Sequence, residues 1–165
     1  MTEARTPEWC GDLGALSDRE LGLLTECAVA VIADGAGDDP DVRELRELPP
    51  SALAPDLIDA LSRSGVIVGE REIDQLCQDS QASRALAIEL LEQACAIPAL
   101  RAEIDAAYVA RRRMLVADPV TIVSITLLVL VLKLRRVKLG HDGLDVTLDP
   151  VRNVIASIIK DLLGS

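Results

Sequence analysis

The sequence predicts a mainly α fold, in which a small bundle of five or six helices is followed by an apolar segment and a C-terminal ββα unit. Three observations predict it. Aliphatic residues recur at helical spacing between helix-capping residues over positions 1–117. The charge balance changes sharply at Asp118, and an uncharged run over 120–132 precedes a strand–turn–strand pattern and an amphipathic helix pattern. We therefore expect three units, residues 1–117, 118–134 and 135–165.

Composition and charge exclude several classes of protein. Half of the 165 residues are apolar, which is too many for a disordered chain. The chain has one Trp, one Tyr and no Phe, and its net charge is −10. Few aromatic rings and an acidic balance argue against nucleic-acid binding. Residues 1–117 hold 11 Arg, no Lys and 22 acidic residues, hence −11, whereas 118–165 hold 6 basic and 5 acidic residues, hence +1.

The first long helix of the bundle has clear signals at both ends. Ser17 and Glu20 form a capping box, in which each side chain accepts a hydrogen bond from the other residue's backbone N–H. Leu21, Leu24, Ala28, Val31 and Ile32 follow at helical spacing, and a glycine at position 35 is a typical helix end.

The other helices of the bundle are shorter or interrupted. Asp39-Pro40 starts a short helix that we expect to stop before Pro49-Pro50. A third helix spans 53–61 and closes at Gly65, and a fourth carries Ile73 and Leu76. Position 80 opens the longest amphipathic run, and the proline at position 98 breaks it before a last helix that reaches Tyr108.

The segment over 119–134 has three interpretations. Its uncharged part, 120–132, would rise about 20 Å as a helix, short of the roughly 30 Å of a bilayer core. A strand buried on both faces and a helix buried in the core are therefore two alternatives to a membrane helix. The membrane helix is favoured by the basic clusters at 111–113 and 133–138, which flank the segment. Met1–Asp12 is polar and predicts no signal peptide, so residues 1–117 are expected in the cytoplasm. A segment that simply spans the membrane would then place the basic 133–138 cluster outside, against the positive-inside rule. A segment that is re-entrant, interfacial or masked within an oligomer avoids this conflict.

The C-terminal unit reads as a β-hairpin and an amphipathic helix. Residues 135–139 and 144–148 flank the turn Gly140-His141-Asp142-Gly143, and Asp149-Pro150 starts the helix. Seven aliphatic residues on one helix face need a partner, either the hairpin or a second copy. The candidates for membrane contact or self-association are Ile122, Val123, Ile125, Leu127, Leu128, Val129, Leu130, Val131, Leu132, Val151, Val154, Ile155, Ile158, Ile159 and Leu162.

No catalytic, cofactor or metal site is expected. Cys10, Cys27, Cys77 and Cys95 form no CxxC pair, and His141 is the only histidine, so neither a zinc site nor a Cys–His nucleophile is indicated. We expect Cys27, Cys77 and Cys95 to be reduced, buried small residues, which agrees with a cytoplasmic location. The acidic cluster over 38–41 lacks a calcium-loop pattern, and the glycines at 35 and 37 do not form a phosphate loop.

The layout resembles a known group of proteins. The acidic helical part, the apolar stretch from Asp118 to Leu132, the basic hairpin from Lys133 to Leu148 and the closing helix are similar to effector-associated accessory proteins of bacterial conflict systems. The resemblance is architectural and carries over no functional residue. It implies a non-catalytic adaptor with small helical, Death-like domains that make homotypic contacts.

The leading hypothesis is therefore a non-enzymatic interaction protein, with an acidic helical recognition module and a hydrophobic C-terminal module that anchors or oligomerises. Expected partners are another protein, a second copy or a membrane, and not nucleic acid. The alternative is a small membrane-acting effector whose 119–134 segment inserts into a bilayer.

Overall fold

The chain is mainly helical in the computed structural model, as the sequence predicts. The structure describes residues 6–35, 50–63, 65, 67, 69–72, 75, 79–111, 136–139, 144–148, 153–154, 157 and 159–161. Its elements are the 3-10 helices η1 (Glu8–Cys10) and η2 (Leu13–Ala15), the helices α1 (Asp18–Gly35), α3 (Pro50–Arg63), α5 (Ser80–Cys95) and α6 (Pro98–Arg111), and the strands β1 (Arg136–Leu139) and β2 (Leu144–Thr147).

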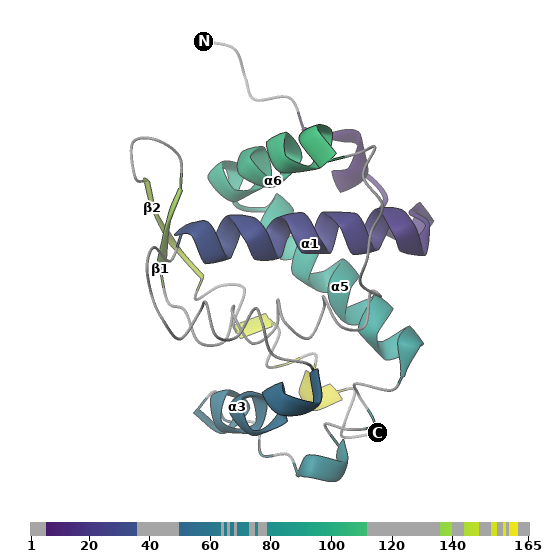
Figure 1. The fold of residues 1–165 in the computed structure, drawn as a ribbon, viewed down its shortest axis with the longest axis vertical. Coiled ribbons are helices and arrows are strands. Elements are labelled where there is room, and N and C mark those ends of the chain that lie inside the picture. The colour runs from purple at the N-terminus through teal and green to yellow at the C-terminus, as the bar shows by residue number, and fades with distance from the viewer. Residues whose placement is uncertain are drawn as a thin grey trace.

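Helix α1 is the central element of the bundle, and it begins at the predicted capping box. The Ser17 backbone N–H donates to Glu20 Oε2 at 3.0 Å, and the Glu20 N–H donates to Ser17 Oγ at 3.2 Å. α1 runs across the middle of the molecule, with α6 beside it and α5 crossing it (Figure 1). Leu21 and Leu24 are fully buried in the core that these helices share.

Helices α5 and α6 form the rest of the described bundle and meet at the predicted proline break. Asp79 caps α5, because its Oδ1 accepts hydrogen bonds from the backbone N–H groups of Gln81 and Ala82 at 3.0 and 3.1 Å. α5 ends at Cys95, and α6 starts at Pro98, whose missing N–H costs nothing at a first helical position. Leu91 of α5 and Ile104 of α6 are buried completely.

Helix α3 starts earlier than the sequence predicts. We expected Pro49-Pro50 to separate two helices and the next helix to begin at position 53, but α3 begins at Pro50 itself. A proline at the first helical position loses no hydrogen bond, so it starts a helix as readily as it ends one. The C-terminal prediction is confirmed, because α3 stops at Arg63 and Gly65 has a positive φ of 86°.

Two predicted helices cannot be compared in full. The helix expected from Asp39-Pro40 lies outside the described residues. Of the helix expected around Ile73 and Leu76, residues 70–72 and 75 are helical, whereas Ile73 and Leu76 themselves lie outside the described residues.

The β-hairpin has the predicted strands and packs on the bundle. β1 and β2 pair antiparallel, with Val137 opposite Val146 and Lys138 opposite Asp145. Val137 is buried and Lys138 is exposed, as strand alternation requires. Both strands contact α6, and β1 also contacts α1. The 140–143 turn, with His141, lies outside the described residues.

The closing helix of the expected ββα unit is described only in part. Residues 153–154, 157 and 159–161 are helical. Val154 is half-buried and Ile159 is buried in the common core. The other four candidate positions of this helix lie outside the described residues: Val151, Ile155, Ile158 and Leu162. The ββα unit as a whole is therefore not established.

The apolar segment over 119–134 also lies outside the described residues, with all nine of its candidate positions from Ile122 to Leu132. Within the part of the chain that is described, no helix is both long and apolar enough to cross a bilayer. The effector hypothesis depends on this segment and stays a prediction.

The N-terminal segment contributes to the core, which the sequence did not indicate. Residues 6–16 form two short 3-10 turns rather than a polar extension. Trp9 is 6% exposed and Leu13 is 3% exposed, and both belong to the same buried cluster as the residues of α1, α5 and α6. This segment therefore lies against the helices and forms one side of the site described next.

Candidate functional site

The cysteines depart from the prediction. Cys10 and Cys95, 85 positions apart, form a disulfide, so the expectation that Cys95 is a reduced core residue is wrong. Cys27 is buried and not part of a disulfide, as predicted, and Cys77 lies outside the described residues. Pairing depends on the tertiary fold, which brings η1 to the end of α5, and widely spaced cysteines carry no local signal of it. Cys95 therefore no longer supports the predicted cytoplasmic location, which remains a prediction.

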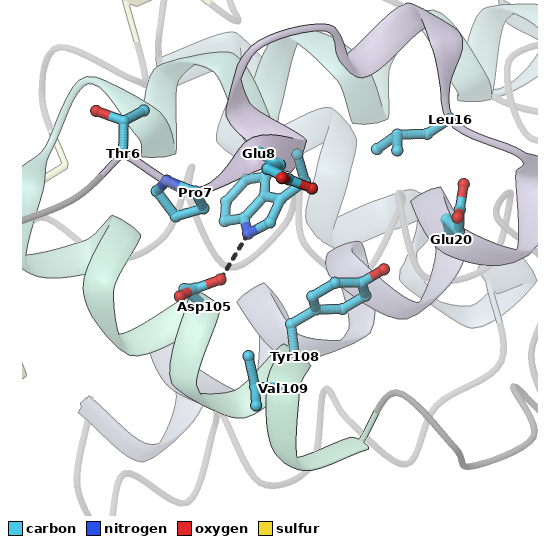
Figure 2. Close-up of a pocket in the computed structure, with 9 residues that line it drawn as sticks. Thr6, Pro7, Glu8, Leu16, Glu20, Asp105, Tyr108 and Val109 are labelled. Atoms are coloured by element: carbon cyan, nitrogen blue, oxygen red, sulfur yellow. Dashed lines mark hydrogen bonds between the residues drawn. The ribbon is translucent and has the colours of Figure 1, made fainter.

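Two connections hold η1 against the helices. The disulfide joins Cys10 to the last residue of α5. The neighbouring residue, Trp9, donates a hydrogen bond from its indole Nε1 to Asp105 Oδ1 of α6 at 3.0 Å, drawn as the dashed line in Figure 2. A buried indole N–H requires such an acceptor, and a carboxylate makes the bond stronger than a neutral partner would. Trp9 therefore has one defined position against α6.

A hollow of about 740 Å³ opens beside this contact (Figure 2). We call it the Trp9–Tyr108 pocket. Three parts of the chain line it: the N-terminal segment, the start of α1 with the residue before its cap, and the last turns of α6. Its lining residues are Thr6, Pro7, Glu8, Trp9, Leu16, Glu20, Asp105, Tyr108 and Val109.

Both aromatic residues of the chain lie at this pocket, although they are 99 positions apart. Trp9 is the only tryptophan and Tyr108 the only tyrosine of the sequence, which has no phenylalanine. Apart from Cys27, the other residues of the buried core cluster are aliphatic. Tyr108 is half-buried and the neighbouring Val109 is 61% exposed, so this end of α6 presents apolar surface at the pocket rim.

The pocket is negatively charged. Glu8, Glu20 and Asp105 contribute three carboxylates, and none of the nine lining residues is Lys, Arg or His. Glu8 and Glu20 are exposed and Asp105 is half-buried. An ionised carboxylate accepts hydrogen bonds but cannot donate them. A ligand that contacts these carboxylates must therefore bring hydrogen-bond donors or positive charge.

The wall at the start of α1 is fixed by further hydrogen bonds. Glu20 is held by the capping box with Ser17. Arg84 of α5 donates from Nη2 to the Leu16 carbonyl at 2.6 Å and to the Gly14 carbonyl at 3.3 Å. It also forms a salt bridge with Asp18. Leu16 and Glu20 are therefore positioned by contacts that need no ligand.

Among the residues that the structure describes, no group of three or more His, Cys, Asp or Glu side chains is arranged to hold a metal ion. The three pocket carboxylates line one hollow without forming such a group.

Sequence reasoning missed this site. Trp9 was noted only as a rare residue, and Tyr108 also as part of the last predicted helix. Glu20 was assigned to the capping box, and Glu8 and Asp105 were counted only in the acidic total. The available signal was a tryptophan within an otherwise polar N-terminal stretch, because a large aromatic ring there requires a surface to bury it. The candidate residues predicted from the sequence all belong to positions 122–162, and the two that the structure describes, Val154 and Ile159, are not among the residues that line the pocket.

Comparisons of this chain with protein-family models, with curated proteins and with solved structures give no significant match.

Proposed function

We propose that the chain is a non-enzymatic interaction protein of the adaptor type, in which the acidic helical part recognises a protein partner at the Trp9–Tyr108 pocket. The observation that carries the proposal is the gathering of both aromatic residues and three carboxylates of the lining at one pre-positioned hollow. Aromatic residues with an exposed apolar neighbour such as Val109 are typical centres of protein interfaces.

The charge distribution supports a protein partner rather than a nucleic acid. Residues 1–117 carry 11 basic against 22 acidic residues, hence a net charge of −11. A field of one sign speeds association with a surface of the opposite sign and disfavours partners of the same sign. A basic protein surface has the opposite sign to residues 1–117 and is attracted to them, whereas a phosphate backbone has the same sign and is repelled.

The C-terminal part would anchor or oligomerise the protein. This role is proposed for residues 118–165, with the ββα unit as its folded portion and the segment over 119–134 as its hydrophobic portion. Packing of β1 on α1 and α6 supports a close physical connection between this part and the recognition module. An arrangement of this kind agrees with the resemblance to conflict-system adaptors, whose helical domains couple sensors to effectors.

Photo-crosslinking in the cells that produce the protein tests the proposal. A photoreactive p-benzoylphenylalanine replaces Val109 at the pocket rim in one variant and Glu92, an exposed residue of α5 away from the pocket, in a control variant. We expect a discrete crosslinked protein from position 109 and not from position 92. The same crosslinks from both positions, or none from position 109, would reject the proposed function.

A further inference from the structure

We infer that the Trp9–Tyr108 pocket receives a single basic side chain of the partner protein, with the guanidinium of an arginine as its preferred occupant. This inference rests on the proposed function and names the chemistry that the partner must present.

Charge is the first argument. Three carboxylates line one hollow, from η1, α1 and α6, and among the described residues that line it none is basic. A cation in this hollow is attracted by each of the three negative charges that line it. The Asp105 carboxylate accepts from Trp9 through Oδ1. A carboxylate has two oxygens with about four acceptor sites, so Asp105 and the two glutamates retain acceptors for the donors of a guanidinium.

The aromatic rings are the second argument, and they are independent of the charge. Cations bind over the faces of tryptophan and tyrosine because the ring quadrupole is negative there. Both rings line the pocket. Tyr108 is half-buried and offers part of its ring to a cation, whereas Trp9 is only 6% exposed and forms the pocket wall beside it. Arginine in particular stacks on aromatic faces and pairs with carboxylates through two parallel hydrogen bonds, which a lysine ammonium does not.

Size and preorganisation complete the case. A volume of about 740 Å³ lies within the range of small-molecule sites and holds a guanidinium together with its aliphatic stem. The Cys10–Cys95 disulfide, the Trp9–Asp105 hydrogen bond and the capping box at Glu20 fix the three walls before any ligand arrives. A site that is already ordered loses less conformational entropy when it binds.

Titration of the full-length protein with short blocked peptides tests the inference. The peptide Ac-Gly-Arg-Gly-NH2 is compared with Ac-Gly-citrulline-Gly-NH2, which has nearly the same shape without the charge, and with Ac-Gly-Lys-Gly-NH2. The single tryptophan of the chain reports directly from the pocket through its fluorescence. We expect binding in the order arginine, lysine, citrulline, with arginine at least about tenfold tighter than citrulline, and binding that weakens as salt screens the charges.

Variants assign the binding to the pocket. Asp105→Asn keeps an acceptor for Trp9 but removes one charge, and it should weaken arginine binding about threefold to tenfold. The matched control is Glu103→Gln, which removes one charge from the same helix at a residue that does not line the pocket, and it should change binding less than twofold. Tyr108→Leu should weaken binding about threefold to tenfold, and Tyr108→Phe, which keeps a ring, should lose clearly less.

Several results would overturn the inference. Equal affinity for the arginine and citrulline peptides, or equal losses in Asp105→Asn and Glu103→Gln, would reject a cation site. A change in Trp9 emission with protein concentration alone would show that a second copy fills the pocket instead. If the arginine peptide does not bind but crosslinks still form at position 109, the basic side chain is rejected as the occupant, while the adaptor function stands. Arginine binding without any Val109 crosslink rejects the protein partner.

Discussion

The disulfide between Cys10 and Cys95 is the connection on which the N-terminal wall of the pocket depends most. Replacing both cysteines by serine removes the crosslink without leaving a lone thiol. The two residues lie 85 positions apart. In the chain-entropy description, closing a loop of this length lowers the entropy of the unfolded chain by about 15 cal/mol/K, or about 4.6 kcal/mol at 25 °C. Measured losses for native disulfides are typically about 2 to 5 kcal/mol, so we expect a loss within that range.

Urea unfolding of the oxidised wild type and of the Cys10→Ser/Cys95→Ser protein measures this difference. Cys27→Ala is the matched control, because it changes a cysteine of the same core that is not part of the disulfide, and it should cost only about 1 kcal/mol. Alkylation of the unfolded protein, followed by mass spectrometry, should show two fewer modified cysteines without reductant than with it. Equal modification under both conditions, or a loss no larger than that of the control, would refute the reasoning.

Three further predictions concern helices α1 and α5 of the bundle. Ser17→Ala removes the hydroxyl that accepts from the Glu20 N–H, and it should destabilise the protein by about 1 kcal/mol in urea unfolding; an unchanged midpoint would contradict a working cap. Leu91→Ala leaves a cavity at a fully buried position and should cost about 2 to 5 kcal/mol by the same assay, whereas a loss below 1 kcal/mol would contradict its place in the core. The pKa of the Glu89 carboxyl group is raised, mainly by partial burial and further by the charge of Glu92 and a hydrogen bond with its side chain. A raised carboxyl pKa stabilises the fold at acid pH and loses that contribution as the pH rises through the folded-state pKa, so Glu89→Gln should raise Tm at neutral pH and not at acid pH; an equal shift at both would contradict this.

The elements that were predicted correctly are those whose signals are local. The capping box at Ser17 and Glu20 lies within four consecutive residues, and the structure forms both of its hydrogen bonds. The proline at position 98 separates α5 from α6 for a reason that needs no tertiary contact. The glycine-flanked turn at 140–143 likewise predicts a hairpin from neighbouring residues, and β1 and β2 pair antiparallel.

The candidate site was missed because its parts are distant in the chain. Trp9 and Asp105 are 96 positions apart, and the two disulfide cysteines are 85 apart. Such pairs meet only through the packing of α1, α5 and α6, which no short pattern encodes. The start of α3 was misplaced for a different reason, since a proline is equally compatible with a helix end and with a first helical position.

The central claim is that a cationic side chain of a partner protein occupies the Trp9–Tyr108 pocket, and competition at the pocket rim tests it most directly. The measurement is the yield of crosslinked protein from p-benzoylphenylalanine at position 109 as blocked arginine or citrulline tripeptide is added. We predict that the arginine peptide lowers the yield in proportion to its occupancy of the pocket, while the citrulline peptide leaves it unchanged. Crosslinking that persists when Trp9 fluorescence shows the pocket filled with arginine would contradict the account.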